Sequence, residues 1–147
     1  MRKHTRLNAV PASAPLLRRL IAVLYDAIAA FTVVYFASFA PVLAVGSTIM
    51  SGNPLFTLYA AGVLFGYFGL CWTRGRTLGM QAWKLAIVSS TTARPPTWRE
   101  AALRFGGAAL SLGCGGLGYL AALFDAEGRT WHDRWSHTRV VRQPPRP

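Results

Sequence analysis

Charged residues are scarce in this chain: only 14% of its 147 residues are Asp, Glu, Lys or Arg, whereas 52% are hydrophobic. A typical soluble domain has about a quarter charged residues, so the composition argues against a soluble protein. The only two cysteines, Cys71 and Cys114, lie in apolar stretches and match neither a disulfide framework nor a zinc site. We therefore expect no structural disulfide, no metal and no cofactor.

The chain also lacks a recognisable catalytic motif. His132 and Asp133 are adjacent, and His137 follows, but no nucleophile, oxyanion motif or third metal ligand accompanies them. We expect Asp125, His132 and Asp133 to form a cytoplasmic motif, and we do not expect an enzyme.

Three long apolar blocks dominate the sequence, at 20–45, 55–72 and 101–124, the last interrupted by Arg104. A helix of about 18 residues or more can cross a hydrocarbon core of about 30 Å. The pattern predicts an all-α integral membrane protein with helices at about 16–45, 55–72, 98–112 and 117–125, between a disordered basic arm at 1–15 and a disordered tail at 143–147.

The third block can be read in two ways. Its middle, at 111–118, is rich in Gly and Ser, which a straight helix disfavours. A single crossing would place the Arg-rich tail outside, so we favour two full crossings followed by a broken, re-entrant segment that returns to the same side. The β-prone runs at 85–89 and 138–141 could then pair, because both would lie on one side of the membrane.

The formal net charge of +11 comes from basic clusters before the first block, between the second and third, and after the third, whereas the loop at 46–54 has none. By the positive-inside rule, this distribution predicts a multi-pass protein with a cytoplasmic N-terminus and C-terminus. Anionic lipid headgroups are the expected partners of the basic clusters, and we do not expect nucleic acid.

Asp26 lies in the first apolar block, where a charge at the centre of a membrane helix costs about 3 kcal/mol. Small residues share its helical face, which suggests that it points toward protein. Arg18 and Arg19 lie too far along the helix to pair with it, so Arg104 is the expected partner by depth. Two interpretations stay open: a structural ion pair, or a carboxylate that binds or carries an ion.

Several motifs, taken in order, resemble the RDD family of small bacterial membrane proteins, which is named for an arginine and two aspartates. They include the run from Arg18 to Asp26, Gly-Arg-Thr-Leu-Gly at 75–79, Arg-Glu-Ala-Ala-Leu-Arg at 99–104 and His-Asp-Arg at 132–134. The resemblance spans about 16–142. It implies that the family arginine is Arg18 or Arg19, and that the aspartates are Asp26 and either Asp133 or, less well matched, Asp125.

One position departs from the family pattern. A lysine usually follows Gly-x-Thr-x-Gly, but this chain has Met80 there, and Lys84 is the nearest base. The resemblance implies a bacterial inner-membrane protein, and some members look like cation/proton antiporters. We therefore expect transport of a small ion through an intramembrane Asp/Arg site. The alternative is a non-transporting scaffold or regulatory subunit that binds a partner through its cytoplasmic loop and tail. With so few helices, we expect a homo-oligomer or a subunit of a larger complex.

Overall fold

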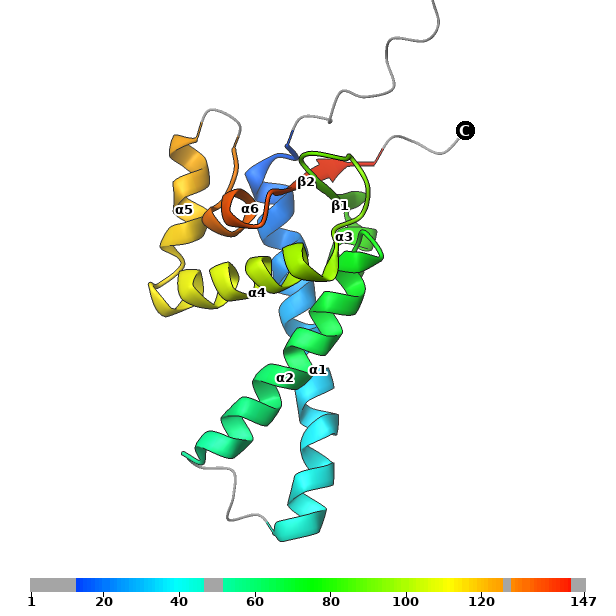
Figure 1. Ribbon diagram of the computed structural model, residues 1–147, viewed down its shortest axis with the longest axis vertical. Helices are drawn as coiled ribbons and strands as arrows, with labels where there is room; N and C mark the ends of the chain where they lie inside the picture. The colour runs from blue at the N-terminus through cyan, green and yellow to red at the C-terminus, as the bar shows by residue number, and fades with distance from the viewer. Residues whose placement is uncertain (1–12, 47–51, 126–127, 144–147) are drawn as a thin grey trace, which may run out of the picture.

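A stalk of two long helices carries a cap at one end (Figure 1). The structure is a computed structural model, and it describes residues 13–46, 52–125 and 128–143. The stalk consists of α1 (Leu16–Val45) and α2 (Pro54–Thr73). The cap contains the first turns of α1 and the remaining elements, which are α3 (Leu78–Ala82), β1 (Leu85–Ser89), α4 (Trp98–Gly113), α5 (Leu117–Phe124), α6 (Trp131–Trp135) and β2 (Thr138–Arg142).

Both stalk helices are long and apolar enough to cross a membrane. The mean hydropathy is 2.1 for the span Leu16–Ala44 and 1.6 for the span Pro54–Ala82, and only 11% of each scored window is buried inside the molecule. Large apolar side chains therefore face outward, including Phe31 at 72% exposure and Leu43 at 82%. Lipid is the solvent in which such surfaces are stable. The expectation of two full crossings is confirmed.

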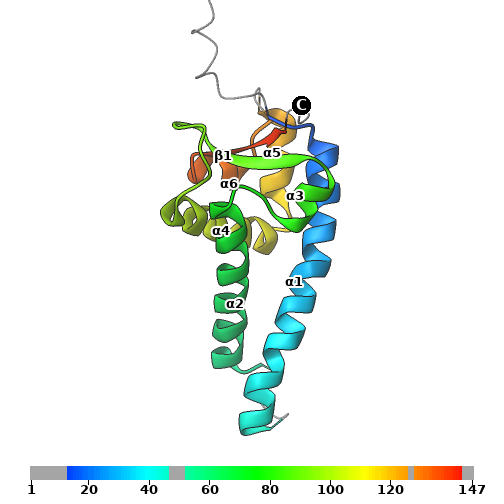
Figure 2. The ribbon, with the colours of Figure 1, turned by 90° about the vertical axis from the view of Figure 1, so that its right-hand side faces the viewer.

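The third hydrophobic segment is broken, as the sequence predicted. The axes of α4 and α5 differ by 101°, and the turn between them contains Gly115 and Gly116, with φ angles of 68° and 83°. Glycine adopts such angles without the steric cost that other residues meet. The segment thus bends sharply where a single crossing would require a straight helix, and α4 lies across the end of α2 (Figure 2).

A two-stranded antiparallel sheet closes the cap. β1 pairs with β2 from Leu85 opposite Arg142 to Ser89 opposite Thr138, so the predicted pairing is confirmed. The chain that leads into α1 joins the same sheet, because the Ala14 amide donates to the Val140 carbonyl at 2.8 Å. Ala14 falls within 1–15, the range expected to be disordered, and residues 1–12 lie outside the described part of the chain.

This sheet fixes how often the chain can cross a membrane. Its three segments come before α1, after α2 and after α5. Hydrogen-bonded strands must lie on one side of the bilayer, and α1 and α2 together return the chain to the side from which it started. With α1 and α2 both crossing, the pairing predicts that the α4–α5 segment begins and ends on that same side, as in the re-entrant alternative.

The cap contains two copies of one structural repeat. Gly-Arg-Thr at 75–77 precedes α3 and β1, and Gly-Arg-Thr at 128–130 precedes α6 and β2. Each copy has a glycine at positive φ, a threonine N-cap, a helix of five residues, a left-handed residue (Lys84 or His137) and a strand of five residues. The middle residues of the two strands, Ile87 and Val140, lie opposite each other. The copies are thus related by a local two-fold arrangement.

The repeat extends to the long helices. A Cβ on Gly79 of α3 would meet the Ala22 carbonyl of α1 at 2.0 Å, and a Cβ on Gly107 of α4 would meet the Cα of His132 in α6 at 3.0 Å. Gly79 and His132 are both the second residue of their short helices. These two contacts align Ala22 of α1 with Gly107 of α4. Three residues before them, Arg19 is aligned with Arg104, and four residues after them, Asp26 is aligned with Ser111.

The sidedness can be tested with single cysteines in a chain whose Cys71 and Cys114 are replaced by serine. We expect a membrane-impermeant thiol reagent to label Thr92→Cys and Arg142→Cys from the same face of oriented vesicles, and Gly52→Cys from the opposite face. Labelling of the first two positions from opposite faces would mean that α4–α5 crosses once.

Candidate functional site

Three charged side chains meet inside the cap. Asp133 of α6 forms ion pairs with Arg19 of α1 through one carboxylate oxygen and with Arg104 of α4 through the other. All three are buried, with exposures of 1%, 4% and 4%. Burying ions is costly unless they are paired and hydrogen-bonded. This cluster therefore joins α1, α4 and α6 through charges that are almost entirely shielded from solvent.

Further hydrogen bonds hold each member of the cluster in place. Arg19 also donates to the Gly128 carbonyl at 2.7 Å, and Arg104 to the Thr138 hydroxyl at 2.8 Å. The Thr130 amide donates to Asp133 at 3.2 Å, so the same carboxylate caps α6. The Arg104 guanidinium lies 5.3 Å from the ring centroid of Trp72, within the range of a cation–π contact.

Asp26 occupies a different place, against α3. Its carboxylate accepts a hydrogen bond from the Thr77 hydroxyl at 2.5 Å and from the Gly79 amide at 2.8 Å. Gly79 is needed for this contact, because a Cβ there would clash with the α1 backbone. The carboxylate is 6% exposed, and among the described residues no basic side chain forms an ion pair with it.

The expected pairing of Asp26 with Arg104 is therefore wrong. The pairing was predicted from the depth of each residue along its own helix, as if α1 and α4 ran side by side. In the structure α4 lies across the stalk. The repeat places Arg104 at the level of Arg19, which is seven residues before Asp26 on α1 and so about 10 Å away along the axis. At that level Asp133 of α6 forms ion pairs with both guanidinium groups.

Some of the other candidate residues belong to the buried charge cluster, and others lie outside it. Arg19, and not its neighbour Arg18, is buried at the charge cluster. Asp125 lies outside the cluster and contacts Arg129 at 3.4 Å and Arg134 at 4.0 Å. Of the two aspartates considered as the second of the family pair, Asp133 is thus the one that meets the buried arginine.

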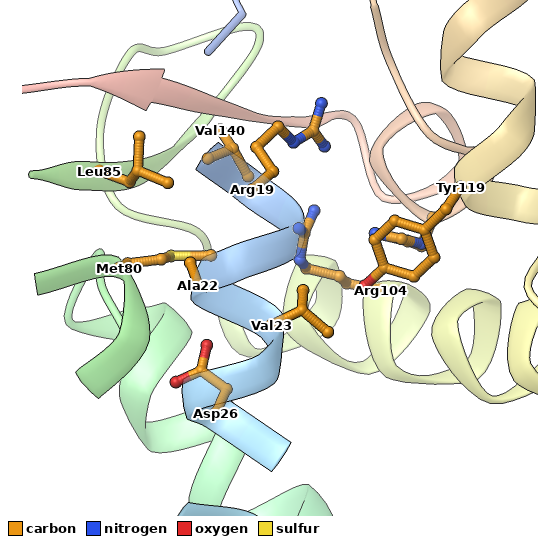
Figure 3. A pocket seen from close by; sticks show the side chains of 10 residues that line it. Arg19, Ala22, Val23, Asp26, Met80, Leu85, Arg104, Tyr119 and Val140 are labelled. Carbon is orange, nitrogen blue, oxygen red and sulfur yellow. The ribbon is translucent and has the colours of Figure 1, made fainter. Parts of the chain in front are cut away.

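A small cavity of about 30 Å³ lies between the charge cluster and Asp26 (Figure 3). Arg19, Asp26, Arg104, Tyr119 and His132 all line it. Asp26 projects from α1 below Ala22 and Val23, and the two arginines lie on the other side of these small residues. The volume has room for one or two water molecules.

His132 is a buried neutral base in this wall. Its ring lies 4.9 Å from the ring of Tyr119, and its Nδ1 has no hydrogen-bond partner among the described residues. Burial, followed by the positive charge of Arg104, lowers the pKa of His132 to about 3. Burial alone would raise the pKa of Asp133, but the guanidinium groups of Arg104 and Arg19 outweigh it and hold that pKa well below its usual range.

Two partners of Asp26 were missed in the sequence, although a signal was present. Thr77 and Gly79 belong to the first Gly-Arg-Thr copy, and Thr130 to the second. A search for internal repeats would have matched these two tripeptides and aligned α3 with α6. Among the described residues, no group of three or more His, Cys, Asp or Glu side chains is placed to hold a metal ion.

Comparison with known proteins supports the resemblance seen in the motifs. The family model of the RDD family matches residues 13–137, which is most of the chain. No curated protein and no solved structure matches the chain. The matched range contains Arg19, Asp26, Arg104 and Asp133, the residues that form the cluster and the Asp26 contact.

Removing the shared carboxylate should have a large effect. We expect Asp133→Asn to lower the free energy of unfolding by about 3–5 kcal/mol, because it leaves two buried guanidinium groups without their counter-ion. Equilibrium unfolding of the detergent-solubilised protein measures this. Arg134→Gln is the control: its side chain is 56% exposed, so we expect a loss below about 1 kcal/mol. Similar losses in both variants would contradict the role of the cluster.

The buried histidine should make the protein sensitive to acid. Below pH 6.5, the ordinary pKa of histidine, the unfolded chain binds a proton that folded His132 takes up only near pH 3, so stability falls as the pH falls. Between pH 7 and 5 we expect a loss of about 2 kcal/mol. Asp133 adds its loss only in stronger acid, below the usual aspartate pKa of 3.8.

Unfolding measured across this pH range should show a reduced slope for His132→Gln. The exposed His137→Gln is the matched control and should keep the slope of the unaltered chain. An unchanged slope for His132→Gln would show that another group causes the acid sensitivity.

Proposed function

We propose that this chain, which belongs to the RDD family, exchanges protons for a small cation across a bacterial inner membrane, with Asp26 as the ion-handling carboxylate. One observation carries the proposal. Asp26 is buried in a membrane-spanning helix, and its hydrogen bonds come from a hydroxyl and a backbone amide rather than from a basic side chain.

The charge cluster explains why Asp26 is available for this role. Both arginines near its helix end are bound to Asp133, so they do not neutralise Asp26 through an ion pair. Ionisable residues inside a membrane are rare, and those that lack a structural partner commonly lie on ion or proton pathways. A cavity with polar side chains in its wall lies beside Asp26, so the carboxylate has a polar space with which it can exchange an ion.

We further propose that the cap lies in the cytoplasm and that the protein works as a homo-oligomer. The exposed bases Arg74, Arg94 and Arg99 lie near the cap end of α2 and at the start of α4, where anionic lipid headgroups would attract them. A second copy would enclose a pathway that two crossings cannot enclose alone. Gly62 and Gly66 of α2 have open space where each Cβ would be, which permits close helix packing.

A second candidate function is a membrane scaffold. The surface of α5 favours it: Leu117, Leu120, Leu123 and Phe124 are 50% to 90% exposed on a short helix that belongs to the cap. Such an apolar surface fits a partner protein as well as lipid. Under this alternative, Asp26 serves only to fix α3 on α1.

Flux measurements separate the two candidates. Purified protein in liposomes should acidify or alkalise the lumen when a sodium or potassium gradient is applied, and we expect Asp26→Asn to reduce this flux at least tenfold. Asp26→Glu keeps a carboxylate and should retain part of the flux. Asp125→Asn, which removes an acid outside the cavity, should leave the flux unchanged.

All variants are compared at equal folded amounts, judged by gel filtration and circular dichroism. If the unaltered protein moves no protons with any alkali cation, the transport proposal fails and the scaffold remains. If Asp26→Asn transports normally, Asp26 is a structural residue.

A further inference from the structure

The cavity lies between the two copies of the repeat. The first copy contributes Arg19, Asp26 and Leu85 to its wall, and the second contributes Arg104 and Val140. Transporters built from repeated halves commonly hold their substrate or coupling ion where the halves meet. Arg19 and Arg104 are matched by the repeat, but Asp26 is matched by Ser111, so each chain carries one such carboxylate.

Two polar groups of residues in the wall are left unpaired by the part of the chain that the structure describes. Arg104 Nε and His132 Nδ1 are buried and lack hydrogen-bond partners among the described residues. Both residues line the cavity, whose volume of about 30 Å³ suits one or two water molecules. Water satisfies a donor and an acceptor at once, which an apolar filling cannot do.

The same wall disfavours an alkali cation. Two arginine residues line the cavity, and the only side-chain oxygens among its lining residues belong to Asp26 and Tyr119. Hard metal cations are held by several oxygen ligands, and two lone-pair positions of Asp26 already accept hydrogen bonds from Thr77 and Gly79. A carboxylate has about four such positions, so a proton can still be added.

We propose that this cavity is a hydrated proton site: Asp26 takes a proton from hydronium, releasing water, and later returns it to water, while alkali cations are excluded. The inference rests on the proposed function and names the ion handled at Asp26. Protonation leaves one net positive charge around the cavity, because Asp133 balances only one of the two arginines. The exchanged cation must then bind elsewhere, and its release is favoured when Asp26 is protonated.

Titratable groups surround Asp26 on several elements, and each can contribute to its protonation. They are Arg19 of α1, Tyr67 and Cys71 of α2, Arg104 of α4, Tyr119 of α5 and His132 of α6. Of these, only the arginines are positively charged at neutral pH, and both are already paired with Asp133.

Infrared difference spectroscopy of the full chain in liposomes tests the inference directly. Stepping the pH should produce a C=O band of a protonated carboxyl group that Asp26→Asn lacks and that Asp26→Glu shows at a shifted frequency. The titration midpoint should stay constant when NaCl, KCl or LiCl rises from 1 to 100 mM at an ionic strength balanced with choline chloride. A competing cation would lower the midpoint by up to about two pH units.

The cavity itself is tested by Ala22→Val, which fills the space beside Asp26, with Ser111→Ala as the control at a buried position of α4 that does not line the cavity. We expect Ala22→Val to slow proton flux at least tenfold, and Ser111→Ala to leave it unchanged. If the midpoint falls with added cation, the cation binds at Asp26 and this inference is overturned, although transport stands. If no flux occurs but the band titrates, the proposed function fails and the proton site stands. If the band is absent, the inference fails.

Discussion

The cap depends on one carboxylate shared by two guanidinium groups. Asp133 reaches Arg19 and Arg104 together, and so binds α6 to a stalk helix on one side and to α4 on the other. Neither arginine could be buried without it, since an unpaired buried charge costs several kcal/mol. The same carboxylate caps α6 through the Thr130 amide. Local and long-range structure are thus fixed by one side chain.

Because Asp133 forms ion pairs with both arginines, neither of them pairs with Asp26. The two acids sit in matched halves of a repeat but in different roles: Asp133 lies on the short helix of the second copy and is fully paired, whereas Asp26 lies on the long helix of the first copy and caps α3. A symmetric scaffold therefore carries an asymmetric charge pattern. One acid stabilises the fold, and the other keeps lone pairs free beside a polar cavity.

The repeat also accounts for the unusual third hydrophobic segment. The helices α1 and α2 are matched by α4 and α5, which are much shorter, and the turn of glycines between α4 and α5 bends them by 101°. Two spanning helices are thus matched by two helices too short to span, and the strands of both copies meet in one sheet. Pairing of those strands requires the short helices to return to the side from which they came.

The amino-acid sequence was enough to predict the membrane class, the two spanning helices, the broken third segment, the strand pairing and the family, because these follow from hydropathy, glycine content, β-prone runs or ordered motifs. It also indicated Asp26, since a carboxylate in an apolar run is conspicuous. Which charged side chains meet depends on how the helices pack. Depth along a helix predicted Arg104 as the partner of Asp26, but the crossing of α4 over the stalk and the packing of α6 brought Asp133 to both arginines. Ion pairs between distant residues, such as Arg19 and Asp133, which are 114 positions apart, depend on how helices cross, and hydropathy carries no information about that geometry.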